Sequence, residues 1–218
     1  LQRGMALYAN FCLGCHSLKF QRYERTADDL DVPHEMALAN VVFTGQKIGG
    51  LMTTAMSPGE AKNWFGGPPP DLTMTARVRG TEWLYNYLKT FYVDESRPFG
   101  VNNKVFPNVG MPHALLPLQG TPRQVCEGFE AIDVLGGKSI IGAERKPKCN
   151  TIAVDAGTGV LDADAFDRAV YDVVNFLYYV GEPSRLERYR LGVWVIGFLV
   201  ILFFFAYLLN REYWKDIH

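Results

Sequence analysis

The sequence has no excess of charge of either sign and very little cysteine. Among its 218 residues, 22 lysines and arginines balance 23 aspartates and glutamates, so the net charge is −1. Proteins that bind nucleic acid carry a basic surface, and this balance gives no indication of one. Of the four cysteines, Cys12 and Cys15 form one close pair, whereas Cys126 and Cys149 lie far apart. A structural zinc site would need a second close pair, which this sequence lacks.

The close pair lies in the run Cys12-Leu13-Gly14-Cys15-His16, whose C-x-x-C-H spacing is typical of covalent haem attachment. The two thiols can add to the haem vinyl groups, and His16 then faces the iron, for which imidazole is a suitable ligand. A thioredoxin-like redox site would need a strand before the pair, but the apolar period of residues 1–11 predicts a helix there. The motif therefore predicts one haem c, with a zinc site or a redox site as the alternatives.

The two remaining cysteines are either buried free thiols or a disulfide. Covalent haem is attached outside the bacterial cytoplasm, in a compartment that also permits disulfides. This context favours a bridge between Cys126 and Cys149, which would close residues 121–152 at their base as an excursion from the domain. No signal peptide precedes Leu1, so we expect either a processed chain or one that lacks its first residues.

One long hydrophobic run lies near the carboxyl end. Residues 191–209 carry no charge, and as a helix they span about 28 Å, close to the hydrocarbon thickness of a bilayer. Arginines precede the run, and Arg211 and Lys215 follow it, so positive charge does not decide the orientation. The side on which haem is attached decides it. We therefore expect residues 1–183 to be a periplasmic haem domain and residues 184–218 to be a single-pass anchor of the inner membrane with a short cytoplasmic tail.

A short helix is expected over residues 33–40, and apolar periodicity predicts further helices over residues 81–92 and 162–180. The last of these ends at Gly181-Glu182-Pro183. Its predicted buried face consists of Phe166, Val170, Val173, Val174, Leu177 and Tyr178.

A haem with His16 on one side needs a second axial ligand from elsewhere in the chain, or an open position. Met111 lies between Gly110 and Pro112, and such a restricted loop suits the presentation of a ligand to the opposite haem face. His113 is the second candidate. Met5 would face the wrong side, since it lies on the helix that leads to the motif. The other methionines have no comparable setting and are expected to be packing residues, as follows: Met36, Met52, Met56 and Met74.

Residues 66–72 form a rigid arm, Gly-Gly-Pro-Pro-Pro-Asp-Leu, which would make a good wall for a porphyrin. Asp71 or Thr73 is expected to cap a helix that begins directly after it. Arg77 and Arg79 follow, and a guanidinium matches a haem propionate well. For Arg77 a solvated surface position is an equally good interpretation.

Taken in order, these segments resemble the cytochrome c1 family, the haem subunits of the cytochrome bc1 complex. The resemblance covers nearly the whole chain and includes Cys12 to His16 followed by Ser17-Leu18-Lys19, then Pro69-Pro70-Asp71-Leu72, Gly110-Met111-Pro112, Glu182-Pro183 and the final anchor. The interval between His16 and Met111 is longer than in small soluble cytochromes c and is similar to that of cytochrome c1.

The resemblance implies a mainly helical class I cytochrome c domain with loop insertions. It implies that Cys12 and Cys15 hold the haem and that His16 and Met111 are its axial ligands. Arg79 looks like the family's propionate-binding arginine, and Pro69 and Pro70 look like its haem wall. The pair Cys126 and Cys149 is similar to a disulfide of bacterial members.

The resemblance also implies a function and partners. The family takes one electron from the Rieske iron–sulfur protein and passes it to a cytochrome c-type acceptor, in a dimeric complex that contains cytochrome b. The chain departs from the family in a shorter start and in lacking a long acidic insertion. Three alternatives stay open: another membrane-tethered cytochrome c serving an oxidase or reductase, a haem enzyme with an open iron position, and a zinc-binding module.

Overall fold

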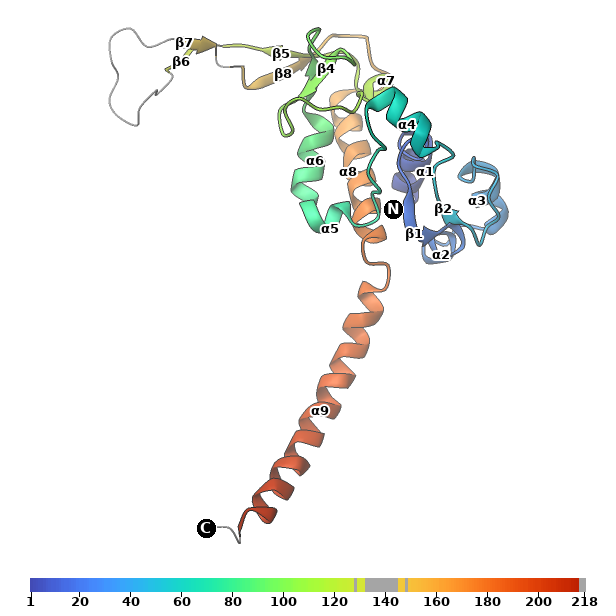
Figure 1. The fold of residues 1–218 in the computed structure, drawn as a ribbon, viewed down its shortest axis with the longest axis vertical. Helices are drawn as coiled ribbons and strands as arrows, with labels where there is room; N and C mark the ends of the chain where they lie inside the picture. The colour runs from blue at the N-terminus through green and yellow to red at the C-terminus, as the bar shows by residue number, and fades with distance from the viewer. Residues whose placement is uncertain (128, 132–144, 148, 216–218) are drawn as a thin grey trace. The chain divides into compact units, whose positions relative to one another are not determined.

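The computed structural model describes residues 1–127, 129–131, 145–147 and 149–215 (Figure 1). The chain divides into two compact units, Leu1–Gly181 and Glu182–His218. The helices within the described residues are α1 (Gln2–Phe11), α2 (Tyr23–Asp29), α3 (His34–Asn40), α4 (Pro58–Phe65), α5 (Thr75–Arg79), α6 (Thr81–Lys89), α7 (Leu116–Gln119), α8 (Ala163–Val180) and α9 (Arg185–Tyr213). Helices thus make up most of the regular structure, which confirms the predicted mainly helical class.

The strands form short antiparallel pairs. The pairs are β1 (Leu18–Arg22) with β2 (Leu51–Met52), β3 (Phe91–Val93) with β4 (Val101–Asn103), β5 (Pro122–Val125) with β8 (Thr151–Val154), and β6 (Phe129–Ala131) with β7 (Arg145–Pro147). The sequence did not predict them, because runs of two to five residues are too short to establish a two-residue period.

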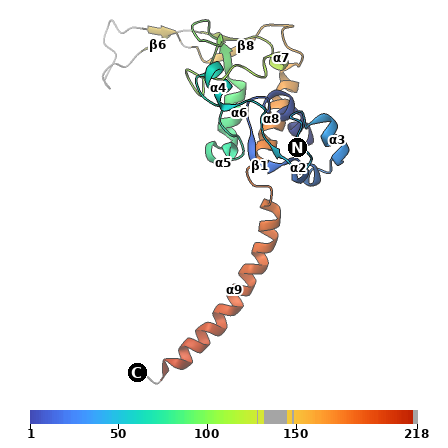
Figure 2. The ribbon, with the colours of Figure 1, turned by 45° about the vertical axis from the view of Figure 1, so that its right-hand side comes forward.

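Helix α8 is central to the core of the first unit, with α1 and α6 packed against it on two sides (Figures 1 and 2). Its first turn is capped by the Asp162 carboxylate, which accepts a hydrogen bond from the Ala165 backbone N–H at 2.7 Å. Such a cap satisfies one of the free amides at a helix start. The helix therefore begins and ends where the sequence predicted.

The buried face of α8 is wider than predicted and differs at three positions, one of which is Val180, buried but absent from the predicted face. Tyr178 is 39% exposed, whereas Phe176, absent from the predicted face, is fully buried. Because both α1 and α6 pack against α8, its apolar surface extends to two sides. Phe176 lies on the side that faces α1. Its ring packs against the Tyr8 ring with 5.6 Å between centroids.

Gly4 allows α1 to approach α8 closely. A Cβ atom at Gly4 would lie 2.1 Å from the Asp172 carbonyl oxygen, far inside van der Waals contact. The absence of a side chain at this one position therefore sets the distance between the two helices. An ion pair between Arg3 and Asp172, at 2.9 Å, accompanies this contact.

A second, smaller apolar cluster surrounds the β3–β4 pair. Its buried members are Phe91, Val101 and Val109, and Tyr87, Phe99 and Met111 pack against it, partly buried. The predicted helix 81–92 ends early, at Lys89, because Phe91 pairs with Asn103 across this ladder. The turn after α6 therefore belongs to the small cluster and not to the helix.

Residues 121–152 leave the core through the β5–β8 pair, and Cys126 and Cys149 form a disulfide directly after it. The predicted bridge is present, and it lies at the base of the excursion. The glycine pair at positions 136 and 137, between the two cysteines in the sequence, lies outside the described residues.

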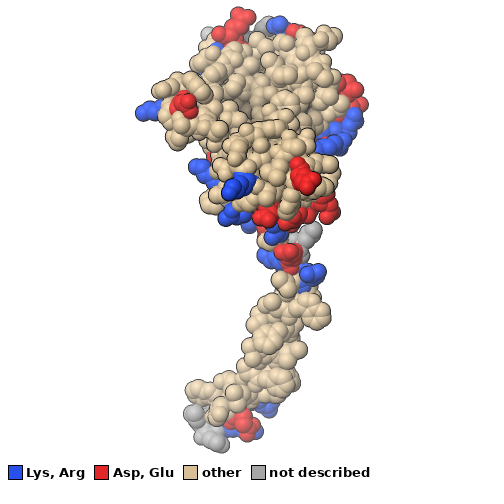
Figure 3. All heavy atoms as spheres, turned by 90° about the vertical axis from the view of Figure 1, so that its right-hand side faces the viewer, with Lys and Arg blue, Asp and Glu red and all other residues tan. Residues whose placement is uncertain are grey.

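Helix α9 contains the uncharged run 191–209 and continues beyond it at both ends. The part from Glu187 to Tyr213 is long and apolar enough to cross a membrane, and its large apolar side chains are exposed. Charged side chains gather at its two ends and leave the middle free (Figure 3). Exposed apolar surface of this extent fits a lipid environment.

Candidate functional site

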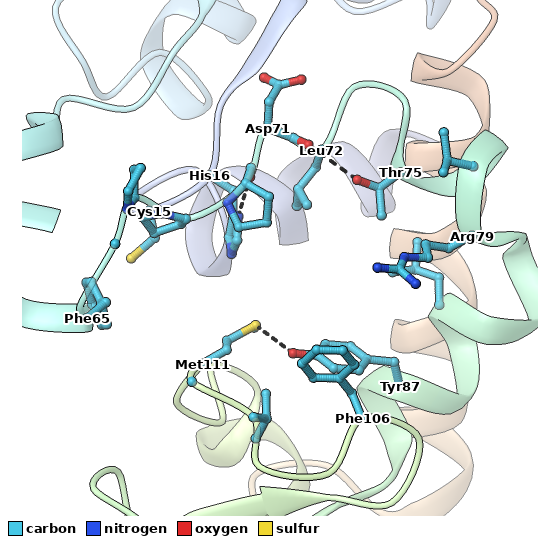
Figure 4. A pocket seen from close by; sticks show the side chains of 18 of the residues that line it. Cys15, His16, Phe65, Asp71, Leu72, Thr75, Arg79, Tyr87, Phe106 and Met111 are labelled. Atoms are coloured by element: carbon cyan, nitrogen blue, oxygen red, sulfur yellow. Dashed lines mark hydrogen bonds between the residues drawn. The ribbon is translucent and has the colours of Figure 1, made fainter. Parts of the chain in front are cut away.

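A cavity of about 720 Å³ lies between segments that are far apart in the sequence (Figure 4). This volume falls within the usual range for sites of organic cofactors, about 300–1,000 Å³. The cavity brings together these site residues predicted from the sequence: Cys15, His16, Pro69, Pro70, Arg79 and Met111. Its other lining residues are mostly apolar or aromatic and include Phe65, Leu72, Val78, Trp83, Leu84, Tyr87 and Phe106.

The Cys12–His16 run forms a tight turn at the end of α1. The backbone N–H groups of Cys15 and His16 both donate to the Cys12 carbonyl, at 3.1 and 2.8 Å. Cys12 is partly buried against the main core, and Cys15 faces the cavity. The turn thus places both thiols and the imidazole within one compact stretch, as haem attachment requires.

The His16 ring points into the cavity and is held in one orientation. Its Nδ1 lies 2.7 Å from the Pro70 carbonyl oxygen, which can only accept a hydrogen bond. Nδ1 therefore carries the proton, and Nε2 keeps its lone pair free toward the cavity. Burial lowers the pKa of His16, opposed by the hydrogen bond to Pro70 and by the charge of Asp71, so the imidazole is neutral at pH 7. This is the form that binds a metal.

The backbone of His16 is fixed from the other side by α1. The Tyr8 hydroxyl, completely buried, donates to the His16 carbonyl at 2.6 Å. Burial raises the pKa of Tyr8 far above its ordinary value, so the hydroxyl remains a donor at all physiological pH values. The main core therefore reaches directly to the imidazole side of the cavity.

The proline arm lines the same side and is tied to the segment after the motif. The Asp71 carboxylate accepts a hydrogen bond from Lys19 N–H at 2.7 Å, and Leu72 N–H donates to the Ser17 carbonyl at 2.9 Å. The predicted helix start at Asp71 or Thr73 is wrong, because α5 begins at Thr75 without a side-chain cap. The Asp71 carboxylate instead accepts hydrogen bonds from the backbone N–H groups of Lys19 and Thr73.

Met111 lies on the side of the cavity opposite His16 (Figure 4). Its sulfur accepts a hydrogen bond from the Tyr87 hydroxyl at 3.4 Å. The Tyr87 ring stacks on Trp83, with 5.0 Å between centroids, and meets Phe91 edge-on. These contacts hold the thioether toward the open space between it and the imidazole.

His113, the second candidate for the axial ligand, faces elsewhere. It is buried, its Nε2 lies 2.6 Å from the Gln119 side-chain oxygen, and its ring stacks on Phe91 with 4.7 Å between centroids. Desolvation lowers the pKa of His113 to about 4, so it is a neutral packing residue.

The remaining methionines fit their expected roles unevenly. Met5 and Met52 are buried in the main core, as a packing role requires. The prediction is wrong for Met36, which is 56% exposed, and for Met74, which is 42% exposed and lines the cavity. Sequence setting did not distinguish them, because solvent and cavity exposure depend on how α3 and α5 pack.

The two arginines after the arm differ in position. Arg79 reaches toward the cavity and lies over the Trp83 ring, 5.1 Å from its centroid (Figure 4). Among the described residues that line the cavity, it is the only basic one. Arg77 is exposed, and the Cγ atom of its side chain lies close to Gly181. Arg79 therefore lines the cavity, and Arg77 does not.

Sequence reasoning missed the contribution of Trp83, Tyr87 and Phe106 to the cavity. Trp83 and Tyr87 lie four residues apart on α6, and this spacing is the same for an ordinary core face and for a cavity wall. Phe106 is 47% exposed in a loop without periodicity. No local signal separates a cavity wall from a core face, since both require large apolar side chains.

Comparison with known proteins assigns the family. The Cytochrome C1 family model matches residues 158–217. Over its whole length the chain is 45% identical to the cytochrome c1 of Allochromatium vinosum and covers 84% of that protein. The chain belongs to the cytochrome c1 family. It is also 24% identical to the cytochrome c1 of Rhodobacter capsulatus, over 98% of this chain and 82% of that protein. A Nitrosomonas europaea protein named ammonia monooxygenase gamma subunit is 41% identical over the whole chain, which covers 83% of it.

Membership of the cytochrome c1 family defines the class of function. The chain carries a single covalently bound haem c and is an electron carrier of the bc1 complex. The site described above fits that cofactor, since a C-x-x-C-H turn, a free imidazole nitrogen and a thioether surround one apolar cavity. Helix α9 fits a single carboxy-terminal membrane anchor.

Proposed function

We propose that the cavity of this cytochrome c1 holds the haem, with Cys12 and Cys15 as its thioether attachments. His16 Nε2 and Met111 Sδ would be the two ligands that hold its iron. Arg79 pairs with a propionate, and Pro69 and Pro70 form the wall on the imidazole side. Haem iron, when bound, supplies a one-electron couple, and these residues set where it lies and how it is tuned.

The opposition of His16 and Met111 across one cavity carries this proposal (Figure 4). The two residues are far apart in the sequence, and no helix or strand contains both. Their side chains nevertheless face the same apolar space from two sides. With both axial positions filled by the chain, no position is left for oxygen or another substrate, so outer-sphere electron transfer is the available chemistry.

The chain tunes the couple through its two ligands. The Pro70 carbonyl accepts the Nδ1 proton of His16, which makes the imidazole a stronger donor. The thioether of Met111 is soft and uncharged and favours ferrous iron, which raises the potential. Arg79 offsets the charge of a propionate next to the apolar wall.

The proposed route of the electron follows the family. The donor is the Rieske iron–sulfur protein and the acceptor is a cytochrome c-type protein, in a dimeric complex that includes cytochrome b. Residues 1–183 form the haem domain on the periplasmic side, and residues 184–218 anchor it in the bacterial inner membrane. Support comes from the family assignment and from the apolar helix Glu187–Tyr213.

The ligand set is tested by the visible spectrum of the purified chain with and without Met111→Leu. The wild type is expected to be low-spin, with the weak methionine–iron charge-transfer band in the ferric form. Met111→Leu should lose the band, lower the midpoint potential and bind carbon monoxide. Met74→Leu is the matched control, because Met74 also lines the cavity; it should keep the band.

Two results would contradict the proposal. Retention of the band in Met111→Leu would move the ligand to another residue, and loss of the band in Met74→Leu would assign it to Met74. The assembly is tested separately by affinity purification of the tagged chain from its own membranes. Recovery of cytochrome b and a Rieske protein is expected, whereas recovery of ammonia monooxygenase subunits instead would favour the role named for the Nitrosomonas relative.

A further inference from the structure

The Met111 side of the cavity is held by buried amides as much as by apolar packing. Its apolar cluster has three buried members, Phe91, Val101 and Val109. Beside it lie two buried asparagines at the end of β4, Asn102 at 8% exposure and Asn103 at 0%. Buried amides are costly unless their hydrogen-bonding groups are satisfied, so their partners indicate what they hold.

Asn103 joins helix α6 to the loop that leads to Met111. Its side-chain nitrogen donates to the Tyr87 carbonyl at 2.7 Å. Its side-chain oxygen accepts from the backbone N–H groups of Val105 and Phe106, at 2.9 and 3.0 Å. A carbonyl can only accept and a backbone N–H can only donate, so these three partners fix the orientation of the amide.

Asn102 fixes the next part of the same loop. Its side-chain oxygen accepts from Asn108 N–H at 2.8 Å, and its nitrogen donates to the Asp94 carboxylate at 2.9 Å. Asn108 has φ of +63°, a conformation that needs support in a residue with a side chain. The Arg97 guanidinium donates to the Asn108 carbonyl at 3.2 Å and so holds the same residue from its other side.

Tyr87 makes hydrogen bonds through both its backbone and its side chain. Its carbonyl accepts from Asn103, and its hydroxyl donates to the Met111 sulfur. The loop that carries Met111 is therefore tied to α6 twice, by Asn103 at its start and by the Tyr87–Met111 contact at its end. Asn103 thus adds a side-chain tie to the backbone pairing of β3 with β4 and to the hydrogen bond from Lys104 N–H to the Thr90 carbonyl at 3.1 Å.

We propose that Asn103 is the positioning residue of Met111, an inference that rests on the proposed ligand role of Met111. Through these three hydrogen bonds, and a fourth at 3.4 Å from the Thr90 hydroxyl to its side-chain oxygen, it keeps the 104–111 loop and Tyr87 in the relative placement that directs the sulfur toward His16. The position needs a donor and an acceptor within one short planar group. Aspartate keeps the shape and the acceptor but loses the donor toward Tyr87, and leucine loses both.

The inference is tested with Asn103→Asp in the full-length, haem-loaded chain. Loss of the donor weakens the tie to α6, so Met111 should leave the iron more often. Carbon monoxide competes with Met111 for ferrous iron, and its apparent affinity should rise about tenfold, the factor that matches one lost buried hydrogen bond. The ferric charge-transfer band should weaken, and the Val105 and Phe106 amides should exchange faster. Asn103→Ser gives the same comparison if the aspartate variant does not fold.

Two controls separate positioning from stability. Asn40→Asp makes the same chemical change at an exposed asparagine that donates to the Met36 carbonyl at 2.9 Å, and it should behave as wild type. Val170→Ala removes core packing in α8, where Val170 is fully buried, and should lower the melting temperature without promoting carbon monoxide binding.

The outcomes distinguish this inference from the proposed function. Asn103→Asp with a lower melting temperature but wild-type carbon monoxide affinity would show that Asn103 is merely structural. If wild type and Met111→Leu bind carbon monoxide equally, Met111 is not the ligand and the inference falls with it. Tighter carbon monoxide binding in Asn103→Asp, with both controls unchanged in this property, supports the inference.

Discussion

The two sides of the cavity are built differently. The imidazole side is continuous with the main core, through the buried Tyr8 and Leu13 and the packing of α1 on α8. The thioether side rests on a small cluster around β3 and β4 and on the amides of Asn102 and Asn103. A region with few buried apolar contacts opens at lower free energy than the global fold. The difference indicates that the segment around His16 opens only when the whole domain unfolds, whereas the loop that carries Met111 can open by a local change.

The contact of α1 with α8 offers the largest expected effect on the imidazole side. Gly4→Val places a side chain where a Cβ already lies 2.1 Å from the Asp172 carbonyl oxygen, so the helices must separate. The free energy of unfolding should fall by about 3 kcal/mol, measured by chemical or thermal unfolding of the detergent-solubilised chain. Gly14→Ala is the control within the haem motif, because a Cβ there meets nothing within 4 Å; equal losses in the two variants would contradict the interpretation.

The Tyr8 hydroxyl offers the next largest effect. Tyr8→Phe leaves the buried His16 carbonyl without its 2.6 Å hydrogen bond. Stability should fall by about 1–2 kcal/mol, with the spectrum of the folded protein unchanged. Tyr171→Phe, at a residue 61% exposed, is the matched control and should unfold as wild type does. A spectral change without loss of stability would show that the imidazole side is not coupled to the core.

On the thioether side, Tyr87→Phe should have the opposite effect: a change in the haem potential with little loss of stability. A thioether is a weak acceptor, so unfolding should change by less than about 1 kcal/mol. Without the hydroxyl, the Met111 sulfur donates electrons more strongly to the iron and favours its ferric form. The midpoint potential should therefore fall by tens of millivolts; for a one-electron couple, about 59 mV corresponds to a tenfold change in the equilibrium constant. Tyr85→Phe, which breaks a contact to Asp167 instead, should leave the potential unchanged. A large stability loss with a constant potential would remove the contrast between the two sides.

The smallest effect is expected at Asp94, and it depends on pH. Hydrogen bonds from Ser96 and Asn102 lower the pKa of Asp94 below its ordinary value of 3.8. The unfolded chain therefore binds the proton first, so the stabilisation is present above pH 3.8 and is lost as the pH falls through the lower, folded value. Asp94→Asn lacks it throughout.

Exchange of the Asn108 amide, corrected for its intrinsic rate, reports on Asp94 because Asn102 joins the two residues. Exchange should be faster in Asp94→Asn than in wild type above pH 3.8, and the two should converge as the pH falls below the lowered, folded pKa of Asp94. Glu60→Gln, which removes the capping carboxylate of α4, is the control and should not affect this amide. A difference that persists at low pH would assign the effect to something other than the Asp94 charge.

Motifs with a fixed local geometry were predicted well from the sequence. The C-x-x-C-H run, the capped helix beginning at Asp162 and the uncharged run 191–209 each depend on neighbouring residues, and each is where it was expected. Predictions that depend on packing were less accurate. Tyr178 was assigned to a buried face but is 39% exposed, and Asp71 was assigned to a helix cap but accepts a hydrogen bond from the distant Lys19.

The sequence by itself determined the chemistry that this chain carries: two thiols and an imidazole within five residues, a methionine in a restricted loop, and one apolar span. Local bonds and short-range periodicity suffice for each of these. The tertiary structure alone decided that Met111 and not His113 faces the cavity, and that the Tyr87 hydroxyl and the Asn103 amide support it. These contacts join residues from different elements, and no spacing along the chain specifies which polar groups meet once those elements pack.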